Sequence, residues 1–205
     1  MYDKYRPIEI SETIPIEDKM KAMKEWFEKH ISLFVKYQIQ EKLFVKAATN
    51  LRVMNFRKGA KEFIDFLHEN QTPLIIISAG IGNFIETFLS YHHCYYDNIY
   101  VSSNKIVFEN GVASGVEKNI IHSLNKNEVS LPSSISEKLE NRKQVILLGD
   151  QVSDLKMVDK SLHDFVLTIG FVADDCKSNI EELKANFDIV CEENDDYMKL
   201  KKLIF

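Results

Sequence analysis

A short apolar run, Leu74–Ile77, limits what this chain can fold into more than any other stretch does. It stops at Ser78, and two glycines, Gly80 and Gly82, follow closely. An apolar run of this length, bounded by turn residues, is typical of a buried strand. We expect a strand over residues 73–78 that ends at Ser78 and then turns through the glycines. Small residues leave backbone amides accessible to an anion, so this strand end is a candidate phosphate site.

A second apolar run, Val145–Leu148, ends in Gly149 and Asp150 and is followed by Asp154. In an open parallel sheet, ligands bind beyond the carboxyl ends of the strands, which is where Ser78 and Asp150 are expected to lie. Two carboxylates at one strand-to-helix turn can reach the same hard cation, and Mg²⁺ prefers a few carboxylates with water and substrate phosphate. The alternatives are that Ser78 caps the next helix, and that Asp150 caps its helix while Asp154 is solvated.

Helical and strand patterns alternate after residue 56, which predicts a parallel sheet with helices on both faces. Apolar residues also recur at helical spacing within residues 16–52, which predicts a small helical unit there. Residues 1–15 are expected to be irregular because Pro7 and Pro15 interrupt any helical period. The predicted helices after residue 56 cover 57–69, 82–91, 133–141, 153–160, 176–186 and 194–204, and the predicted strands cover 73–78, 98–102, 144–149, 164–169 and 187–191, with a β-hairpin over 104–116.

The composition of the chain excludes several kinds of partner. Of its 205 residues, 45% are hydrophobic, which is enough for a sizeable core. The net charge of −5 argues against binding to duplex nucleic acid, which needs clustered Lys and Arg. No apolar run approaches the about 20 residues that span a membrane, and no signal peptide is evident, so we expect a cytosolic protein without a membrane partner. Three cysteines without metal-ligand spacing, Cys94, Cys176 and Cys191, are expected to be reduced core thiols.

These motifs together resemble the haloacid dehalogenase superfamily of phosphotransferases. The sequence SAG at one strand end, a lysine in an Asn-Lys context further on and GDxxxD after another strand occur in the order of that superfamily's motifs. Within the superfamily, the chain is similar to the cytosolic pyrimidine 5′-nucleotidases, also called type III 5′-nucleotidases. The resemblance implies an α/β fold with a Rossmann-like parallel sheet, divided into a partial helical cap (residues 1–54) and a core (residues 55–205). The stretches that look like the family lie at residues 5–10, 25–27, 76–82, 111–112, 121–126 and 146–150.

The resemblance also implies roles for residues that would bind phosphate. Ser78 matches the residue that hydrogen-bonds the transferring phosphoryl group, and Ala79 and Gly80 offer backbone amides beside it. Lys126 matches the lysine that neutralises charge on the nucleophile and the phosphate. Without the resemblance, Lys126 carries almost no signal, because most lysines lie on the surface.

Further roles implied by the resemblance concern the metal and the base. Asp150 matches the Mg²⁺ ligand, and Asp154 matches the second acid, which supports the metal's surroundings. Glu9 lies where the family has a cap glutamate that accepts a hydrogen bond from an amine of the base; the alternative is a solvated loop acid. His30, four residues after Trp26, replaces a base-contacting serine and is itself a candidate base contact. The commoner outcome for such a helix histidine is partial burial.

One motif of the family is not found in this chain. The first motif is an apolar strand that ends in DxD, carries the nucleophile and the general acid, and precedes the position of Glu9. Asp174-Asp175 and Asp195-Asp196 do not replace it, because both pairs are better explained as acids at helix starts. We therefore expect the nucleophile to lie outside this chain, in a longer form of the enzyme, and residues 1–205 to be inactive alone.

The expected function is Mg²⁺-dependent hydrolysis of pyrimidine nucleoside 5′-monophosphates, CMP and UMP, through an aspartyl-phosphate. The complete form is expected to be a monomer that binds no nucleic acid. Two alternatives stay open. The first is a catalytically inactive nucleotide-binding protein, and the second is another phosphatase of the superfamily that acts on a sugar phosphate.

Overall fold

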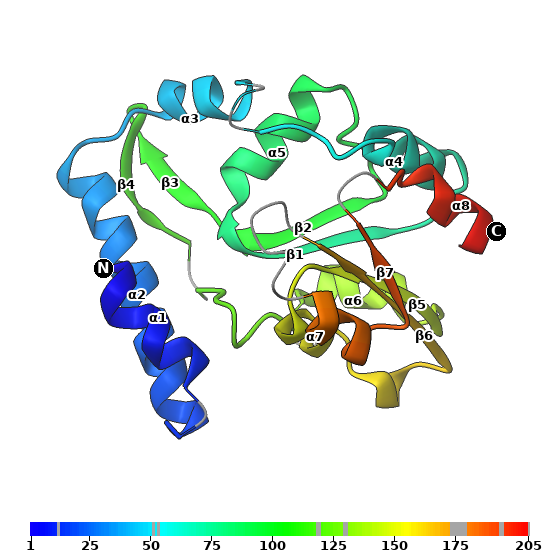
Figure 1. Ribbon diagram of the computed structural model, residues 1–205. Coiled ribbons are helices and arrows are strands. Elements are labelled where there is room, and N and C mark those ends of the chain that lie inside the picture. The colour runs from blue at the N-terminus through cyan, green and yellow to red at the C-terminus, as the bar shows by residue number, and fades with distance from the viewer. Residues whose placement is uncertain are drawn as a thin grey trace. The chain divides into compact units, whose positions relative to one another are not determined.

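The computed structural model describes residues 1–11, 13–50, 52, 54–117, 120–128, 131–172, 180–192 and 195–204 (Figure 1). Contacts divide the chain into two compact units. β1 (Leu74–Ile81) and β2 (Ile99–Asn104) pair as a two-stranded sheet, and each of these strands contributes residues to both units. The proposed division into a cap and a core at residue 54 stays a prediction. Unit 1 consists of Met1–Met54, Ile76–Tyr95 and Val101–Lys126, and unit 2 of Asn55–Ile75, Tyr96–Tyr100 and Asn127–Phe205.

Unit 1 combines helices with an antiparallel hairpin. The predicted hairpin is confirmed, and its turn residues Asn110 and Gly111 have φ values of 52° and 74°, the left-handed conformations that a tight hairpin turn requires. Phe44 is 4% exposed and stacks on Phe84 with ring centroids 4.6 Å apart, in an apolar core that α2, α3, α5 and the hairpin share. The elements are α1 (Tyr2–Ile10), α2 (Ile16–Lys36), α3 (Glu41–Ala48), α5 (Gly82–Tyr91), β3 (Ile106–Glu109) and β4 (Val112–Val116).

The prediction that residues 1–15 are irregular is wrong for α1, which contains Pro7. A proline inside a helix costs about 3 kcal/mol, so packing must compensate. Tyr5 is 1% exposed, and its ring is stacked on Trp26 of α2 with centroids 5.6 Å apart. Tyr2 meets the same indole edge-on at 6.1 Å. A helix this short depends on such tertiary contacts, which the local sequence does not reveal; Figure 1 shows α1 lying beside α2.

Unit 2 contains a parallel sheet of three of the predicted strands, in the order β5-β6-β7, whereas the predicted strands at 73–78 and 98–102 correspond to β1 and β2, which pair in a separate sheet. The central strand, β6, includes Ile169, which is 0% exposed, and packs against α4 and α8 through Phe63, Leu67 and Leu200. A second apolar cluster, around Leu183 of α7, also packs in this unit. The elements are α4 (Ala60–Glu69), α6 (Ser133–Leu139), β5 (Gln144–Gly149), β6 (Phe165–Phe171), α7 (Ile180–Asn186), β7 (Ile189–Cys191) and α8 (Met198–Ile204).

The predicted helix over 153–160 is wrong. Two 3₁₀-helical turns, η2 (Val152–Met157) and η3 (Lys160–Leu162), stand in its place. Val152 and Leu155, three residues apart as suits a 3₁₀ turn, pack against the second cluster of unit 2, as do Met157 and Val158. Tertiary packing therefore selects the tighter helix.

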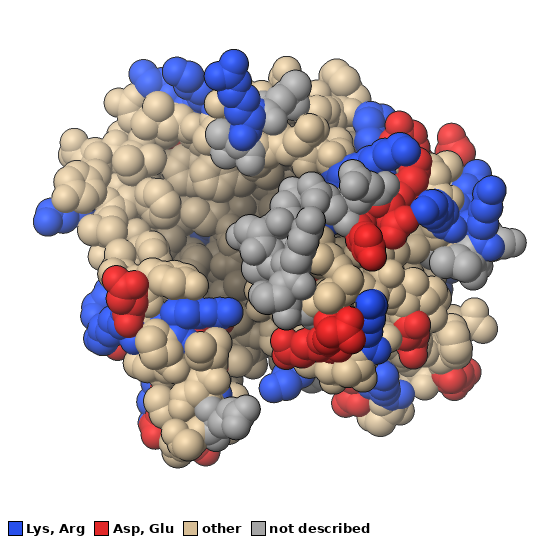
Figure 2. Space-filling model, viewed as in Figure 1, with Lys and Arg blue, Asp and Glu red and all other residues tan. Residues whose placement is uncertain are grey.

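Several composition-based expectations can be compared with the structure. Cys94 and Cys191 are buried free thiols, as predicted, and Cys176 lies outside the described residues. No helix in the described part of the chain is both long and apolar enough to cross a membrane. On the face that Figure 2 shows, basic and acidic side chains are interspersed among the described residues.

Candidate functional site

The strand end that carries Ser78 differs from the predicted turn. β1 continues through Ser78, Ala79 and Gly80 to Ile81, and α5 begins only at Gly82. The Ser78 Oγ accepts the Gly80 N–H at 3.1 Å and does not cap α5, so the helix-cap alternative is wrong. The hydroxyl acts as an acceptor in this bond, which leaves its hydrogen able to donate to a phosphate oxygen.

Both glycines of this segment lie where a Cβ would closely approach a serine hydroxyl. A Cβ on Gly82 would lie 2.2 Å from the Ser103 Oγ, and a Cβ on Gly80 would lie 3.2 Å from the Ser78 Oγ. Gly80 is exposed, so its backbone can approach a ligand closely. The chemistry that the sequence predicted for this segment, contact with an anion by small residues, is compatible with the observed extended backbone.

Lys126 ends a loop, residues 120–126, which we call the lysine loop. Asn125 holds this loop: its Oδ1 accepts the His122 N–H at 2.6 Å, and its Nδ2 donates to the Ile120 carbonyl at 2.9 Å. His122 is 7% exposed, and its Nδ1 accepts the Leu124 N–H at 3.3 Å. Burial lowers the pKa of His122, so the neutral imidazole that this bond requires is favoured. The backbone leading to Lys126 is therefore held by side chains rather than by regular secondary structure.

Glu9 contacts the lysine loop from α1. Its Oε1 accepts the Ser123 hydroxyl and its Oε2 accepts the Arg6 Nη1, both at 2.5 Å. The Glu9 side chain is 13% exposed, so the alternative of a solvated loop acid is wrong. A carboxylate has about four lone-pair positions, and so Glu9 can still accept a hydrogen bond from an amine of a base. The hydrogen bond to Glu9 raises the pKa of Arg6, which keeps the guanidinium charged.

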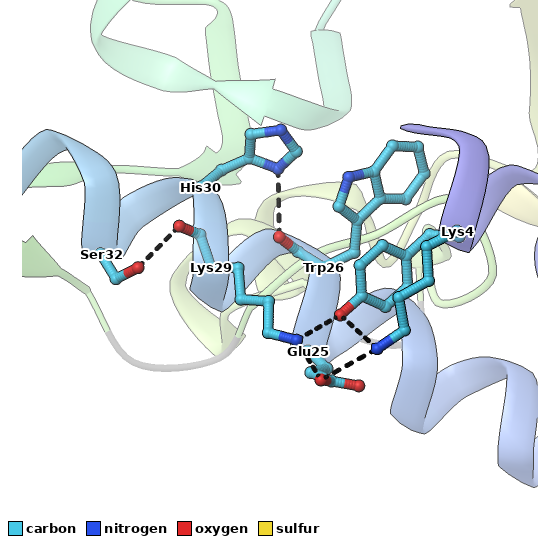
Figure 3. Close-up of polar contacts among 7 residues, drawn as sticks. Lys4, Glu25, Trp26, Lys29, His30 and Ser32 are labelled. Carbon is cyan, nitrogen blue, oxygen red and sulfur yellow. Dashed lines mark hydrogen bonds and ion pairs between the residues drawn. The ribbon is translucent and has the colours of Figure 1, made fainter. Parts of the chain in front are cut away.

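The face of α2 beside α1 carries Trp26 and His30 (Figure 3). His30 is exposed, contrary to the expectation of partial burial, and its Nδ1 donates to the Trp26 carbonyl at 3.1 Å. Its ring centroid lies 5.8 Å from that of Trp26. On the same face, Lys29 donates to the Tyr5 hydroxyl at 2.8 Å and to Glu25 at 2.5 Å. These bonds attach α1, and with it Glu9, to α2.

The predicted metal residues lie in unit 2, where β5 ends. Asp150 is exposed, whereas Asp154 is 4% exposed, and its Oδ2 accepts the N–H groups of Asp150 at 3.0 Å and of Gln151 at 3.2 Å. This is the reverse of the alternative in which Asp150 is the cap and Asp154 is solvated. A Cβ on Gly149 would lie 2.7 Å from the Asp154 Cβ, so a glycine is needed for this close packing.

The chemistry of these acids can be compared with what Mg²⁺ requires. No group of three or more His, Cys, Asp or Glu side chains within the described ranges could hold a metal ion. Mg²⁺ usually keeps several waters and binds through one or two carboxylates plus substrate phosphate. The exposed carboxylate of Asp150 fits such a site, and Asp154 orients the backbone of Asp150. Magnesium binding at Asp150 stays a prediction.

The remaining acid pairs, Asp174-Asp175 and Asp195-Asp196, were predicted to lie at helix starts. Asp196 accepts the N–H of Met198, the first residue of α8, at 2.9 Å, so it lies at a helix start, as predicted. Asp195 accepts the Glu192 N–H at 2.9 Å from the preceding segment, and its carboxylate pairs with Lys199 of α8. Asp174-Asp175 lies outside the described residues. The predicted phosphate and base residues thus all belong to unit 1, and Asp150 and Asp154 belong to unit 2.

Comparison with solved structures defines the class of this fold. A phosphoserine phosphohydrolase-like protein from Francisella tularensis subsp. tularensis SCHU S4 matches with a TM-score of 0.53 at 16% identity, over 99% of this chain and 83% of its own. Cytosolic 5′-nucleotidase IIIB bound to cytidine matches with a TM-score of 0.84 at 28% identity, over 98% of this chain and 68% of its own. The fold is therefore the α/β fold of haloacid dehalogenase-like phosphatases.

Sequence comparison then gives the family. The family described as "Pyrimidine 5′-nucleotidase (UMPH-1)" matches residues 1–205, and the chain belongs to it. A 7-methylguanosine phosphate-specific 5′-nucleotidase of Mus musculus is 34% identical over 199 residues, which cover 95% of this chain. The match covers 66% of the mouse protein, so this chain spans slightly less than two thirds of that relative's length.

Proposed function

We propose that the protein is a 5′-nucleotidase that hydrolyses nucleoside 5′-monophosphates to nucleoside and phosphate with the help of Mg²⁺. The observation that carries the proposal is in unit 1, where Glu9 is bonded to Ser123 of the same loop that delivers Lys126. A base-recognising carboxylate and a phosphate-binding lysine are thereby attached to one short loop. This suits a substrate that has a base at one end and a phosphate at the other.

Each residue has a defined task in this proposal. Ser78 donates its hydroxyl hydrogen to a phosphoryl oxygen, and Lys126 supplies a point charge beside the phosphate. Asp150, in unit 2, would hold Mg²⁺, and a bound Mg²⁺ would supply positive charge that neutralises a phosphate. Asp154 keeps the Asp150 backbone in place. The proposal assigns no nucleophile among the described residues.

The favoured substrates are CMP and UMP. The family name and the cytidine bound to a related 5′-nucleotidase support pyrimidine bases. The second candidate is 7-methylguanosine monophosphate, which the name of the mouse relative favours. Its methylated base carries a positive charge and an exocyclic amine, both of which suit the carboxylate of Glu9. We further propose a cytosolic, monomeric protein.

Phosphate release by the full-length polypeptide tests the proposal. CMP, UMP and 7-methylguanosine monophosphate are compared with glucose 6-phosphate, with Mg²⁺ and after its removal by EDTA. We expect release from at least one nucleotide with Mg²⁺, little from the sugar phosphate and none after EDTA. Ser78→Ala should lower kcat about 100-fold, as for loss of one preorganised donor, whereas Ser90→Ala on the exposed side of α5 should not.

The competing explanations give different results in the same experiment. Release from glucose 6-phosphate that exceeds release from every nucleotide would establish a sugar phosphatase. Tight CMP binding by calorimetry without any turnover would establish a nucleotide-binding protein that lacks catalysis. Either result contradicts the proposed function.

A further inference from the structure

A buried asparagine at the end of β2 connects the Ser78 strand end with the lysine loop. Asn104 is 2% exposed. Its Nδ2 donates to the Ala79 carbonyl at 3.0 Å and to the Ile121 carbonyl at 2.7 Å, and lies 3.4 Å from the Gly80 carbonyl oxygen. Its Oδ1 accepts the Ile121 N–H at 2.8 Å. One side-chain amide therefore bonds to both segments at once, and all of these residues belong to unit 1.

An asparagine is well suited to this place. Its side-chain amide has an NH₂ group that donates and an oxygen that accepts. The NH₂ group bonds to the Ile121 C=O and the oxygen to the Ile121 N–H, so the side chain pairs with this residue as the backbone of a neighbouring strand would. The second donor direction of the Nδ2 reaches Ala79. A buried polar group that is fully bonded in this way has one favoured geometry, and leaving any of its partners unpaired would be costly. The hydrogen bonds of Asn104 therefore fix the distance between the strand end at Ala79 and the lysine loop at Ile121, and they also stabilise the fold.

The bonding continues along the loop toward the lysine. Asn125 closes the turn between Ile120 and His122, and Lys126 follows directly. The two asparagines together leave the backbone from residue 120 to 125 few alternative conformations. A shift at Asn104 would consequently be transmitted to Lys126 on one side and to the Ala79–Gly80 peptide group on the other.

We infer that Asn104 is a positioning residue: its side chain sets the spacing between the Ser78–Gly80 strand end and the lysine loop, and so the geometry in which a phosphoryl group is bound. The inference rests on the proposed function of this site. Asn104 is buried, so it acts through Ala79 and Ile121. Misplacement of a catalytic group by about 1 Å costs on the order of 100-fold in rate.

The test uses Asn104→Asp in the full-length polypeptide. Aspartate has nearly the same shape but places a carboxylate oxygen against carbonyl oxygens. The matched control is Asn98→Asp, just before the other end of β2, where the Asn98 Nδ2 donates to the Thr72 carbonyl at 2.7 Å. Both variants should unfold at a lower urea concentration than the unaltered protein does. Only Asn104→Asp should lower kcat/KM for CMP, by about 100-fold, and weaken inhibition by inorganic phosphate, while inhibition by cytidine, which has no phosphate, stays unchanged.

The outcomes separate a positioning role from a purely structural one. If inhibition by phosphate and by cytidine weakens equally, or if the two variants lose activity in proportion to their loss of folded protein, the inference is wrong. If Asn104→Asp does not fold, Asn104→Ala gives the same comparison without a buried charge.

The inference can also be separated from the proposed function. If the unaltered protein releases phosphate from no nucleotide, the proposed function fails. Thermal unfolding with inorganic phosphate then decides the role of Asn104. If phosphate stabilises the unaltered protein and Asn98→Asp but not Asn104→Asp, the positioning role of Asn104 is supported. If phosphate does not stabilise the unaltered protein, or stabilises the unaltered protein and both variants equally, the positioning role of Asn104 is wrong.

Discussion

The carboxylate of Asp154 accepts the backbone N–H of Asp150 at 3.0 Å, so one acid of the GDxxxD motif holds the other in place. Asp154 is buried and Asp150 is exposed, and the two therefore cannot have equivalent roles. A charged acceptor is stronger than a neutral one for a pair of backbone donors. The motif thus combines a residue that faces solvent with a residue that shapes the turn.

Asp154→Asn is expected to lower the free energy of unfolding by about 1–2 kcal/mol, because hydrogen bonds to a charged group become neutral ones. It should also raise the Mg²⁺ concentration required for half-maximal activity by about tenfold or more, as for loss of a residue that orients a metal ligand. Urea unfolding and a Mg²⁺ titration measure the two effects. Asp159→Asn is the control, because Asp159 makes a similar bond to the Ser161 N–H in η3. An identical Mg²⁺ requirement in Asp154→Asn and the unaltered protein would contradict the expectation.

Glu9→Gln is expected to discriminate between bases. CMP carries an amine that can donate to Glu9, whereas UMP carries a carbonyl oxygen at the same position. Loss of the charge should lower kcat/KM for CMP about tenfold, the value of one charge-assisted hydrogen bond, and should change the value for UMP much less. Steady-state kinetics with both nucleotides measure this, with Glu28→Gln, at an exposed position of α2, as control. Equal losses for CMP and UMP would show that Glu9 does not contact the base.

The stability of the protein is expected to fall at mildly acidic pH because of His122. Burial lowers its pKa in the folded state, and the nearby charge of Glu9 opposes this only in part. The unfolded chain, in which the pKa is about 6.5, therefore binds the proton more readily. The stabilising effect of the neutral histidine is present above pH about 6.5 and is lost as the pH falls toward the folded-state pKa.

Urea unfolding at a series of pH values measures this loss. His122→Gln should show a smaller decrease in unfolding free energy between neutral and mildly acidic pH than the unaltered protein. His30→Gln, which changes an exposed histidine, should retain the full decrease. The same pH dependence in His122→Gln and the unaltered protein would exclude His122 as its source.

Gly149→Ala is expected to destabilise unit 2 by about 1–3 kcal/mol, the usual cost of overpacking. The new methyl group would lie 2.7 Å from the Asp154 Cβ and 3.0 Å from its Oδ2. Gly115→Ala in β4 is the matched control, because no atom lies within 4 Å of a Cβ at that position. Urea denaturation midpoints of the two variants compare them directly. A Gly149→Ala variant as stable as Gly115→Ala would show that the turn can rearrange.

Local sequence was sufficient where short-range physics decides the conformation. The strand over 144–149 and the helix over 82–91 were predicted with the bounds that the structure has, because an apolar run or an uninterrupted helical stripe leaves few alternatives. Asn110-Gly111 was sufficient to predict the hairpin, since both residues tolerate positive φ. The order of the motifs, together with their resemblance to a family, was sufficient to select candidate residues.

The sequence did not reveal which partners those residues have. Ser123 bonds to Glu9 across 114 positions of the chain, and Asn104 bonds to Ile121 across 17, so neither contact leaves a periodic signal. A signal was present for Asn125, which belongs to the Asn-Lys motif itself, whereas Asn104 lies at the start of the predicted hairpin, away from every predicted motif. Their importance depends on burial, which only the fold determines.

The sequence by itself determined the α/β class, the family and the residue types of the candidate site, because these follow from local patterns and from motifs. Tertiary structure decided that Pro7 lies within a helix, that residues 152–157 form a 3₁₀ helix, and that Asp154 rather than Asp150 is buried. Each of these outcomes depends on what packs against the segment. Packing energies of a few kcal/mol outweigh local preferences of similar or smaller size.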